Sequence, residues 1–258
     1  MRHFSARKLI HTTPKQSSAR HSIIVGYATN PVNAGYGVKT ISFLKVGSEK
    51  IDLTSVTPVS ATYEGEGLEG CAQLMLLNAG GGTITDAIYM WENWGSPEET
   101  GWTLDSTFIK PGDFELDPGT AVWIYVDSIF TDLQFQCAGQ VAEKTVTIPV
   151  VKGYSIGGNP FPVPYDMINA YPTSDTYEGE GLEGCVSMMR INAGGGTITD
   201  AIYMWENWGS PEETGWTLDS TFIGEGDLVL GIGESLWLDN SVIGDLYLNF
   251  PCMIGEDK

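Results

Sequence analysis

The sequence of residues Thr62–Ile109 reads TYEGEGLEGCAQLMLLNAGGGTITDAIYMWENWGSPEETGWTLDSTFI, and almost the same letters return at Thr176–Ile223. The two stretches agree at 43 of 48 positions, and the five differences all lie within residues 72–77 of the first copy. Two copies are too few for a solenoid, and a unit of about 115 residues has the size of an ordinary domain. The sequence therefore predicts two tandem homologous domains, residues 22–142 and 143–258.

Short runs rich in β-branched and aromatic residues dominate each unit, and the first unit contains QLMLLN, DAIYMWEN and AVWIYVD between clusters of Gly, Pro, Asn and Asp. Runs of this length and composition are typical of strands, and the intervening NAGGGT is typical of a hairpin turn. A short helix around Tyr165–Ala170 is the only helix that the pattern supports. The predicted fold class is all-β, with each unit an antiparallel β-sandwich or a partly open barrel.

The five differences between the copies test the strand assignment. In a strand over residues 71–77 alternate side chains share one face, so Ala72, Leu74 and Leu76 lie together. In the second copy a charged residue, Arg190, stands where the first copy has Leu76. We therefore expect the end of this face to reach solvent in the second unit.

The 258 residues carry 33 acidic and 13 basic side chains, which gives a formal net charge of −20. Because a phosphate backbone is held mainly by Lys and Arg, this balance argues against nucleic acid as a partner. The composition, with 42% hydrophobic and 18% charged residues, is that of a globular protein. No run approaches the roughly 18 apolar residues that a membrane-spanning helix needs, so no membrane span is predicted.

Residues 1–21 are basic, contain no acidic side chain and hold all three histidines, His3, His11 and His21. Their few apolar groups cannot form a core, so we expect a disordered basic tail. A wrongly extended gene start, a working basic arm and an organellar-type targeting peptide are the alternatives, and the stretch lacks the apolar segment of a secretory signal. Because the body has no imidazole, the sequence argues against Ser-His-Asp and Cys-His catalysis and against histidine zinc sites.

Each unit contains two cysteines at similar spacing. Cys71 and Cys137 are 66 residues apart, and Cys185 and Cys252 are 67 residues apart. Equal spacing predicts one disulfide within each unit, and such bonds persist in an oxidising compartment. The alternative is that all four cysteines are buried free thiols.

The acidic loops support weaker hypotheses. GEGLEG at residues 65–70 matches a dinucleotide-binding pattern, but a strand follows it and its glutamates would repel phosphate, so it predicts an acidic loop. No cofactor is expected. The alternative is that calcium binds to one of two groups of carboxylates. A pair of carboxylates is also what a glycoside hydrolase needs for catalysis. The two groups are Glu64, Glu66 and Glu69, and Asp113, Glu115 and Asp117.

The densest aromatic motif is MWENWGSPEETGW, which occurs in both copies. It supplies the candidate ligand-binding residues Trp91, Trp94, Trp102, Trp205, Trp208 and Trp216. A polar turn between the second and third tryptophan makes burial of all three difficult, and exposed indoles are good platforms for the faces of sugars. The alternative places Trp91 in the strand core and the other two as packing over the hairpin. Exposure of Trp94 and Trp102 in one groove would favour binding.

The first unit opens with VGYATNPVNAGYGVKTISFLKVG at Val25–Gly47 and closes with PGTAVWIYVDS and LQFQCAGQV. The second unit opens with KGYSIGGNPFPVPYDMINAY at Lys152–Tyr171. This layout of a Gly-Tyr strand, a Gly-Asn-Pro-Phe-Pro turn and a closing aromatic strand resembles secreted, repeat-bearing bacterial surface β-proteins of unknown function. The resemblance implies an extracellular or cell-envelope location, a non-enzymatic role and no catalytic residues.

These observations predict a non-enzymatic extracellular or cell-envelope β-repeat protein with a structural or adhesive role. Its expected partner is a glycan or another surface protein. One alternative is a bivalent carbohydrate-binding module that uses the tryptophan clusters. The other is a glycoside hydrolase built on a carboxylate pair.

Overall fold

The computed structural model describes most of the chain beyond residue 50 and two short stretches before it. The described residues are 23–24, 37–42, 51–77, 84–117, 119, 121–127, 129–130, 133–136, 138–139, 144–161, 163–191, 198–240 and 243–252. The predicted tail, residues 1–21, lies outside them. The predicted domain boundary at residues 142–143 also lies outside them and stays a prediction.

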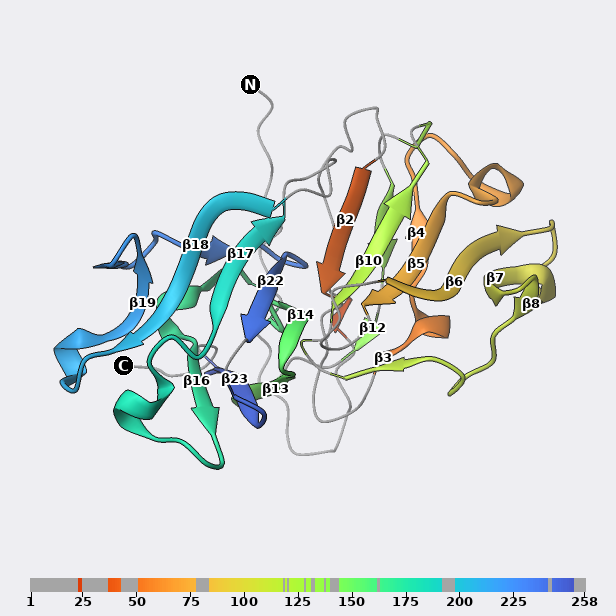
Figure 1. Ribbon diagram of the computed structural model, residues 1–258. Coiled ribbons are helices and arrows are strands. Elements are labelled where there is room, and N and C mark those ends of the chain that lie inside the picture. Colours follow the sequence, from red (N-terminus) through yellow and green to blue (C-terminus); the bar gives the residue numbers. More distant parts are fainter. Residues whose placement is uncertain are drawn as a thin grey trace, which may run out of the picture.

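Each half of the chain contributes a six-stranded antiparallel sheet, and the two sheets have the same strand order (Figure 1). The first runs β2 (Gly37–Ser42), β10 (Ala121–Val126), β5 (Ala72–Leu77), β6 (Ile84–Asn93), β7 (Thr100–Leu104) and β8 (Thr107–Phe108). The second runs β14 (Gly153–Gly158), β22 (Ser235–Asn240), β17 (Ser187–Ile191), β18 (Ile198–Asn207), β19 (Thr214–Leu218) and β20 (Thr221–Phe222). In neither sheet does the last strand pair with the first, so the described strands form open, sandwich-like sheets and no closed barrel.

Smaller antiparallel pairings accompany the two large sheets. In the first half they join β3 (Ile51–Asp52) to β9 (Glu115–Leu116), β4 (Thr57–Val59) to β11 (Gln134–Gln136), and β1 (Ile23–Ile24) to β12 (Ala138–Gly139). In the second half they join β15 (Tyr165–Asp166) to β21 (Val229–Leu230), and β23 (Leu246–Phe250) to both β13 (Val146–Val150) and β16 (Tyr171–Ser174).

The helical content of the described residues consists of 3-10 turns, without an α-helix. The turns are η1 (Leu53–Ser55), η2 (Gly65–Leu68), η3 (Pro97–Glu99), η4 (Met167–Asn169), η5 (Gly179–Leu182) and η6 (Pro211–Glu213). The short helix predicted around Tyr165–Ala170 is one of these, η4, whose first amide groups are capped by the Asp166 carboxylate accepting from Ile168 N at 3.2 Å. The all-β fold class is confirmed.

Two hydrophobic clusters form the cores of the described chain. One contains residues between Ile51 and Phe135, and the other residues between Val146 and Phe250. Each cluster joins the inner face of a large sheet to side chains of the smaller pairings, as Leu74 of β5 does with Leu116 of β9. Each copy of the repeat therefore buries its own apolar side chains.

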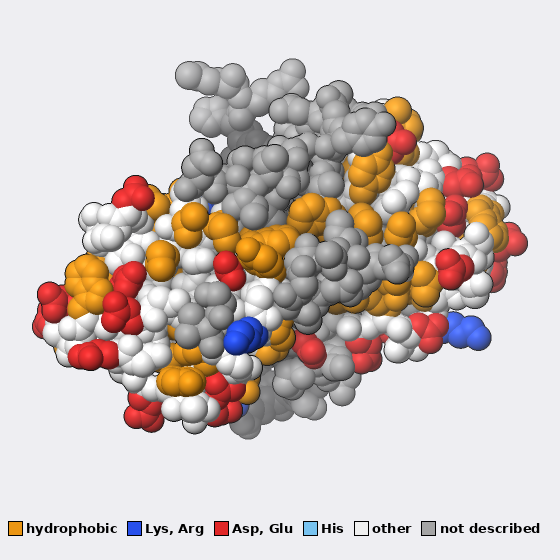
Figure 2. Space-filling model, viewed as in Figure 1, with side chains coloured by type: hydrophobic (Ala, Val, Ile, Leu, Met, Phe, Trp, Pro, Cys, Tyr) orange, Lys and Arg blue, Asp and Glu red, His pale blue; other side chains and the backbone are white. Residues whose placement is uncertain are grey.

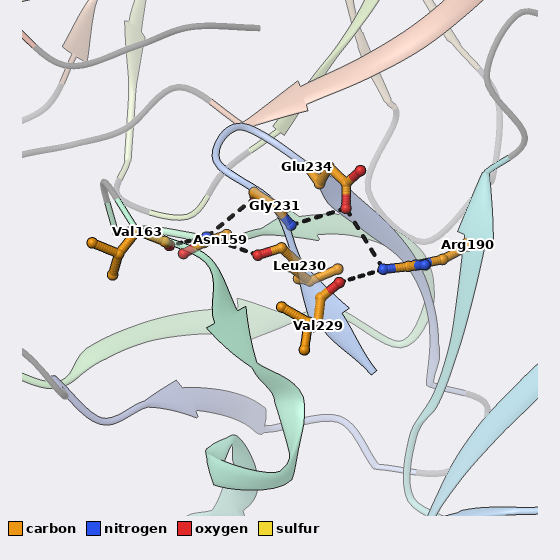
Figure 3. Close-up of polar contacts among 7 residues, drawn as sticks. All are labelled: Asn159, Val163, Arg190, Val229, Leu230, Gly231 and Glu234. Atoms are coloured by element: carbon orange, nitrogen blue, oxygen red, sulfur yellow. Dashed lines mark hydrogen bonds and ion pairs between the residues drawn. The ribbon is translucent and has the colours of Figure 1, made fainter. Parts of the chain in front are cut away.

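Strand β5 shows how alternation in the sequence builds this core. Ala72 and Leu74 are fully buried and Leu76 packs against the same cluster. At the equivalent end of β17 the side chain of Arg190 is 45% exposed, and its guanidinium donates to Val229 O and lies 3.6 Å from a Glu234 carboxylate oxygen (Figure 3). The expectation that this face reaches solvent in the second unit is confirmed.

The two halves contact each other beside the edge strands β2 and β14 of the large sheets. The indole rings of Trp123 in β10 and Trp237 in β22 meet edge to face, with centroids 6.3 Å apart and planes inclined at 75°. Gly158 N also donates to Gly119 O at 3.1 Å across the junction. The contact therefore joins equivalent strands of the two repeats.

Candidate binding surface

The aromatic motif forms a long hairpin whose connection is held by backbone hydrogen bonds. Strands β6 and β7 are joined through η3, and Trp94 N donates to Glu99 O at 2.9 Å. Gly95 has φ +93°, a left-handed conformation that glycine adopts without strain, and a side chain there would meet the Glu66 carboxylate. The second copy repeats this arrangement at Gly209, with φ +91°.

Two of the three tryptophans in each motif belong to the core. Trp91 and Trp102 face each other across β6 and β7, are 6% and 1% exposed, and pack edge to face with centroids 5.5 Å apart. Trp102 also donates from Nε1 to Val56 O at 2.8 Å. Trp205 and Trp216 are buried in the same way, and Trp216 Nε1 donates to Ala170 O at 2.7 Å.

The remaining tryptophan of each motif is on the surface. Trp94 is 45% exposed and Trp208 is 44% exposed. Trp94 packs edge to face on Phe108 with centroids 5.0 Å apart, and Trp208 packs in the same way on Phe222. These phenylalanines were not among the predicted site residues, although both copies of the repeat carry them. The candidate binding surface is therefore Trp94 with Phe108, and Trp208 with Phe222.

Polar groups lie next to this aromatic surface. Trp94 donates from Nε1 to a Glu92 carboxylate oxygen at 3.3 Å, which orients the indole. An open groove of about 600 Å³ beside it is lined by Asn93, Ser96 and Thr100 and by the buried edges of the core tryptophans, whereas Trp94 is not part of its lining. The predicted arrangement, with Trp94 and Trp102 exposed in one groove, is therefore not formed.

The acidic loops do not converge on a metal site. Within the described part of the chain, no three His, Cys, Asp or Glu residues are grouped so that they could hold a metal ion. Asp113 instead accepts from Lys110 N at 2.7 Å within its own turn. Among the described residues that line the groove, Glu98 is the only carboxylate, so this groove lacks the pair that glycoside hydrolysis needs.

The cysteines correct one prediction. Cys71 and Cys185 are buried free thiols, so neither predicted disulfide is formed, and Cys137 lies outside the described residues. Equal spacing along the chain does not set the direction of a side chain, and both thiols sit in the core clusters. Burial raises the pKa of each of these two thiols to about 12, which leaves them protonated at neutral pH. The cysteines therefore give no argument for an oxidising compartment.

Comparison with protein-family models, with curated proteins and with solved structures gave no match. Among the described residues, no helix is long and apolar enough to cross a membrane. The features of this chain that bear on its function are therefore the aromatic surface and the duplication of that surface.

Proposed function

We propose that this chain is a non-enzymatic protein of the extracellular space or cell envelope with a structural or adhesive role, in which each repeat presents the same aromatic binding surface. The observation that carries the proposal is the matched exposure of Trp94 and Trp208, each on a phenylalanine of its own hairpin. Aromatic side chains are enriched at protein interfaces relative to the rest of the surface, and here an exposed indole occurs twice in the same setting.

The packing of each indole supports a role in binding. Its phenylalanine contact and, in Trp94, its hydrogen bond to Glu92 hold the ring in place before any partner arrives. A ring that is already ordered loses little conformational entropy on binding. Two such surfaces on one chain also raise the avidity for a partner with repeated sites.

Several observations favour a non-enzymatic role. The raised pKa values of Cys71 and Cys185 remove these two thiols as nucleophiles at neutral pH. The groove beside Trp94 offers Glu98 without a second lining carboxylate among the described residues. The three histidines of the sequence all lie within its first 21 residues.

The assignment to the extracellular space or the cell envelope rests on the resemblance of the repeat units to secreted surface β-proteins. The near-identity of the two copies agrees with a role in multivalent contact, since one active site would need only one copy. Detection of the chain by protease shaving of intact cells, with a cytosolic protein as the negative control, tests this part of the proposal.

A bivalent carbohydrate-binding module is the second candidate. It is favoured by the position of the exposed Trp94 next to a groove with the polar side chains of Asn93, Ser96 and Thr100, because sugars combine an apolar face with hydroxyl groups. Under this alternative the partner is a glycan, and under the leading proposal it is another surface protein or an envelope polymer.

Binding of the full chain to a glycan array and to immobilised extracellular-matrix proteins tests both candidates. We expect Trp94→Ala and Trp208→Ala each to weaken binding by removing one of two sites, and the double variant to abolish it. Tyr171→Ala is the matched control, because Tyr171 is 41% exposed and lies on β16, outside the candidate surface. Glycan binding would select the second candidate, and equal binding by wild type and double variant would contradict both.

A further inference from the structure

The outer faces of the two large sheets, which point away from the cores, are apolar along one row. Directly opposed residues of antiparallel strands share a face of the sheet, and the strand register places Trp123, Met75 and Ile88 side by side across β10, β5 and β6. The second sheet has the same row, with Trp237, Met189 and Ile202 across β22, β17 and β18. Along this row, each sheet therefore carries apolar side chains on its outer face as well as on the inner face that covers the core.

The inner end of each row is used by the contact between the two halves. Trp123 and Trp237 pack against each other, and Met189 next to them is 8% exposed. The Nε1 atoms of both tryptophans are buried, and no described residue accepts a hydrogen bond from either. Two buried donors without hydrogen-bond partners cost free energy. Because the two rings are nevertheless packed together, the burial of apolar surface in this contact must offset that cost.

The outer end of each row is exposed. Ile88 is 41% exposed, Ile202 is 46% exposed and Met204, two residues further along the same face of β18, is 40% exposed. Ile88 lies two strands from Trp123, which corresponds to about 10 Å. We call Ile88, Ile202 and Met204 the outer-face patch. Hydrophobic side chains are visible near the junction of the two halves and over strands of both (Figure 2).

We infer that the outer-face patch is a docking surface for a second copy of this chain. The patch has two parts, Ile88 on the first sheet and Ile202 with Met204 on the second, and they lie at the outer ends of the two rows whose inner ends meet in the contact between Trp123 and Trp237. A face that is complementary to its own copy within one chain is suited to an isologous contact between two chains. The three side chains alone form an apolar surface smaller than a standard interface, so the expected dimer is weak.

The charge of the chain gives this contact a characteristic salt dependence. Two copies with a net charge of −20 repel each other, and on the outer face of the second sheet Asp239 and Glu206 lie beside the patch. Salt screens this repulsion and strengthens the burial of apolar surface. Dimerisation is therefore favoured at high ionic strength, whereas docking of a basic partner would be weakened by the same change.

Sedimentation velocity of the full chain at concentrations up to about 100 μM tests the inference. The wild type is expected to pass from 28.0 kDa towards twice that mass, and to do so at lower protein concentration when salt is raised. The triple variant Ile88→Thr, Ile202→Thr and Met204→Thr is expected to self-associate about tenfold or more weakly, since threonine keeps the preference for strand but removes apolar contact.

The matched control is the double variant Ile129→Thr and Ile168→Thr, which removes exposed isoleucines of similar accessibility elsewhere on the molecule and should dimerise like the wild type. If the triple variant does not fold, as judged by circular dichroism, Ile202→Thr alone should weaken association in the same direction. A wild type that stays at 28.0 kDa in high salt, or a folded patch variant that dimerises as the wild type does, would overturn the inference. Trp94→Ala with Trp208→Ala should leave the dimer intact, so this inference and the proposed function fail separately.

Discussion

The indole nitrogen of Trp102 donates a 2.8 Å hydrogen bond to the backbone oxygen of Val56, which lies 46 residues earlier in the chain. The bond ties the aromatic hairpin to the end of η1, and Trp216 makes the equivalent bond to Ala170 O in the second copy. The same aromatic motif thus supplies one tryptophan that joins two parts of the core and one, Trp94, that faces solvent.

Replacing Trp102 by phenylalanine should destabilise the protein. Trp102 is 1% exposed, so Trp102→Phe removes a buried hydrogen bond and leaves a cavity, and we expect a loss of about 2–4 kcal/mol in the free energy of unfolding. Chemical denaturation followed by circular dichroism measures this loss. Trp94→Phe is the control and should change stability by less than about 0.5 kcal/mol. Equal effects of the two substitutions would contradict the assigned roles.

The sequence predicted the strand pattern but not which tryptophans are buried. Alternation in β5 correctly grouped Ala72, Leu74 and Leu76 on one face and predicted that the end of this face, at Arg190 in the second copy, reaches solvent, because this pattern is local. The burial of Trp102 depends on the pairing of β6 with β7, which sets Trp91 opposite Trp102. Trp94 lies just beyond the end of β6, and a strand boundary of that kind is poorly determined by local sequence.

Other features depend on relations that a single sequence does not contain. The repeat shows that Trp123 and Trp237 are equivalent, but nothing local indicates that equivalent residues of two units meet. The equal cysteine spacing in the two copies likewise reflects duplication, and it carries no information on the direction of the Cys185 side chain.

Glycine at position 157 is expected to be required for the packing of the second core. A Cβ atom there would lie 2.5 Å from Ile148 Cδ1 and 2.9 Å from Leu238 Cδ1, and both of these side chains are buried. Gly157→Ala should therefore lower the free energy of unfolding by about 1–3 kcal/mol through overpacking. Gly244→Ala is the control, because a Cβ atom at Gly244 meets nothing within 4 Å. Thermal unfolding of both variants gives the comparison, and an unchanged Gly157→Ala variant would show that Ile148 can move aside.

Asn159 and Arg190, which lie at opposite ends of the linked polar contacts in Figure 3, should differ in their contribution to stability. Asn159 is fully buried, donates from Nδ2 to Val163 O at 2.7 Å and accepts from Phe161 N at 2.9 Å, so Asn159→Ala should cost about 2–4 kcal/mol. Arg190 is 45% exposed, and Arg190→Leu, which restores the residue of the first copy, should change stability by less than about 0.5 kcal/mol. Urea unfolding of the two variants measures both values, and a larger loss for Arg190→Leu would contradict this ranking.

The buried thiols of Cys71 and Cys185 should make the fold less stable at alkaline pH. Burial raises the pKa of each thiol from 9.0 to about 12, so above pH 9 the unfolded chain releases protons that the folded chain retains. The unfolded state then binds fewer protons, and by linkage the stabilisation that is present below pH 9 declines as the pH rises towards 12. The melting temperature, measured between about pH 8 and pH 10.5, should therefore fall less steeply in a Cys71→Ala and Cys185→Ala double variant than in the wild type. Identical slopes would show that these thiols do not contribute, and iodoacetamide labelling at pH 8 that reached them only after unfolding would confirm their burial independently.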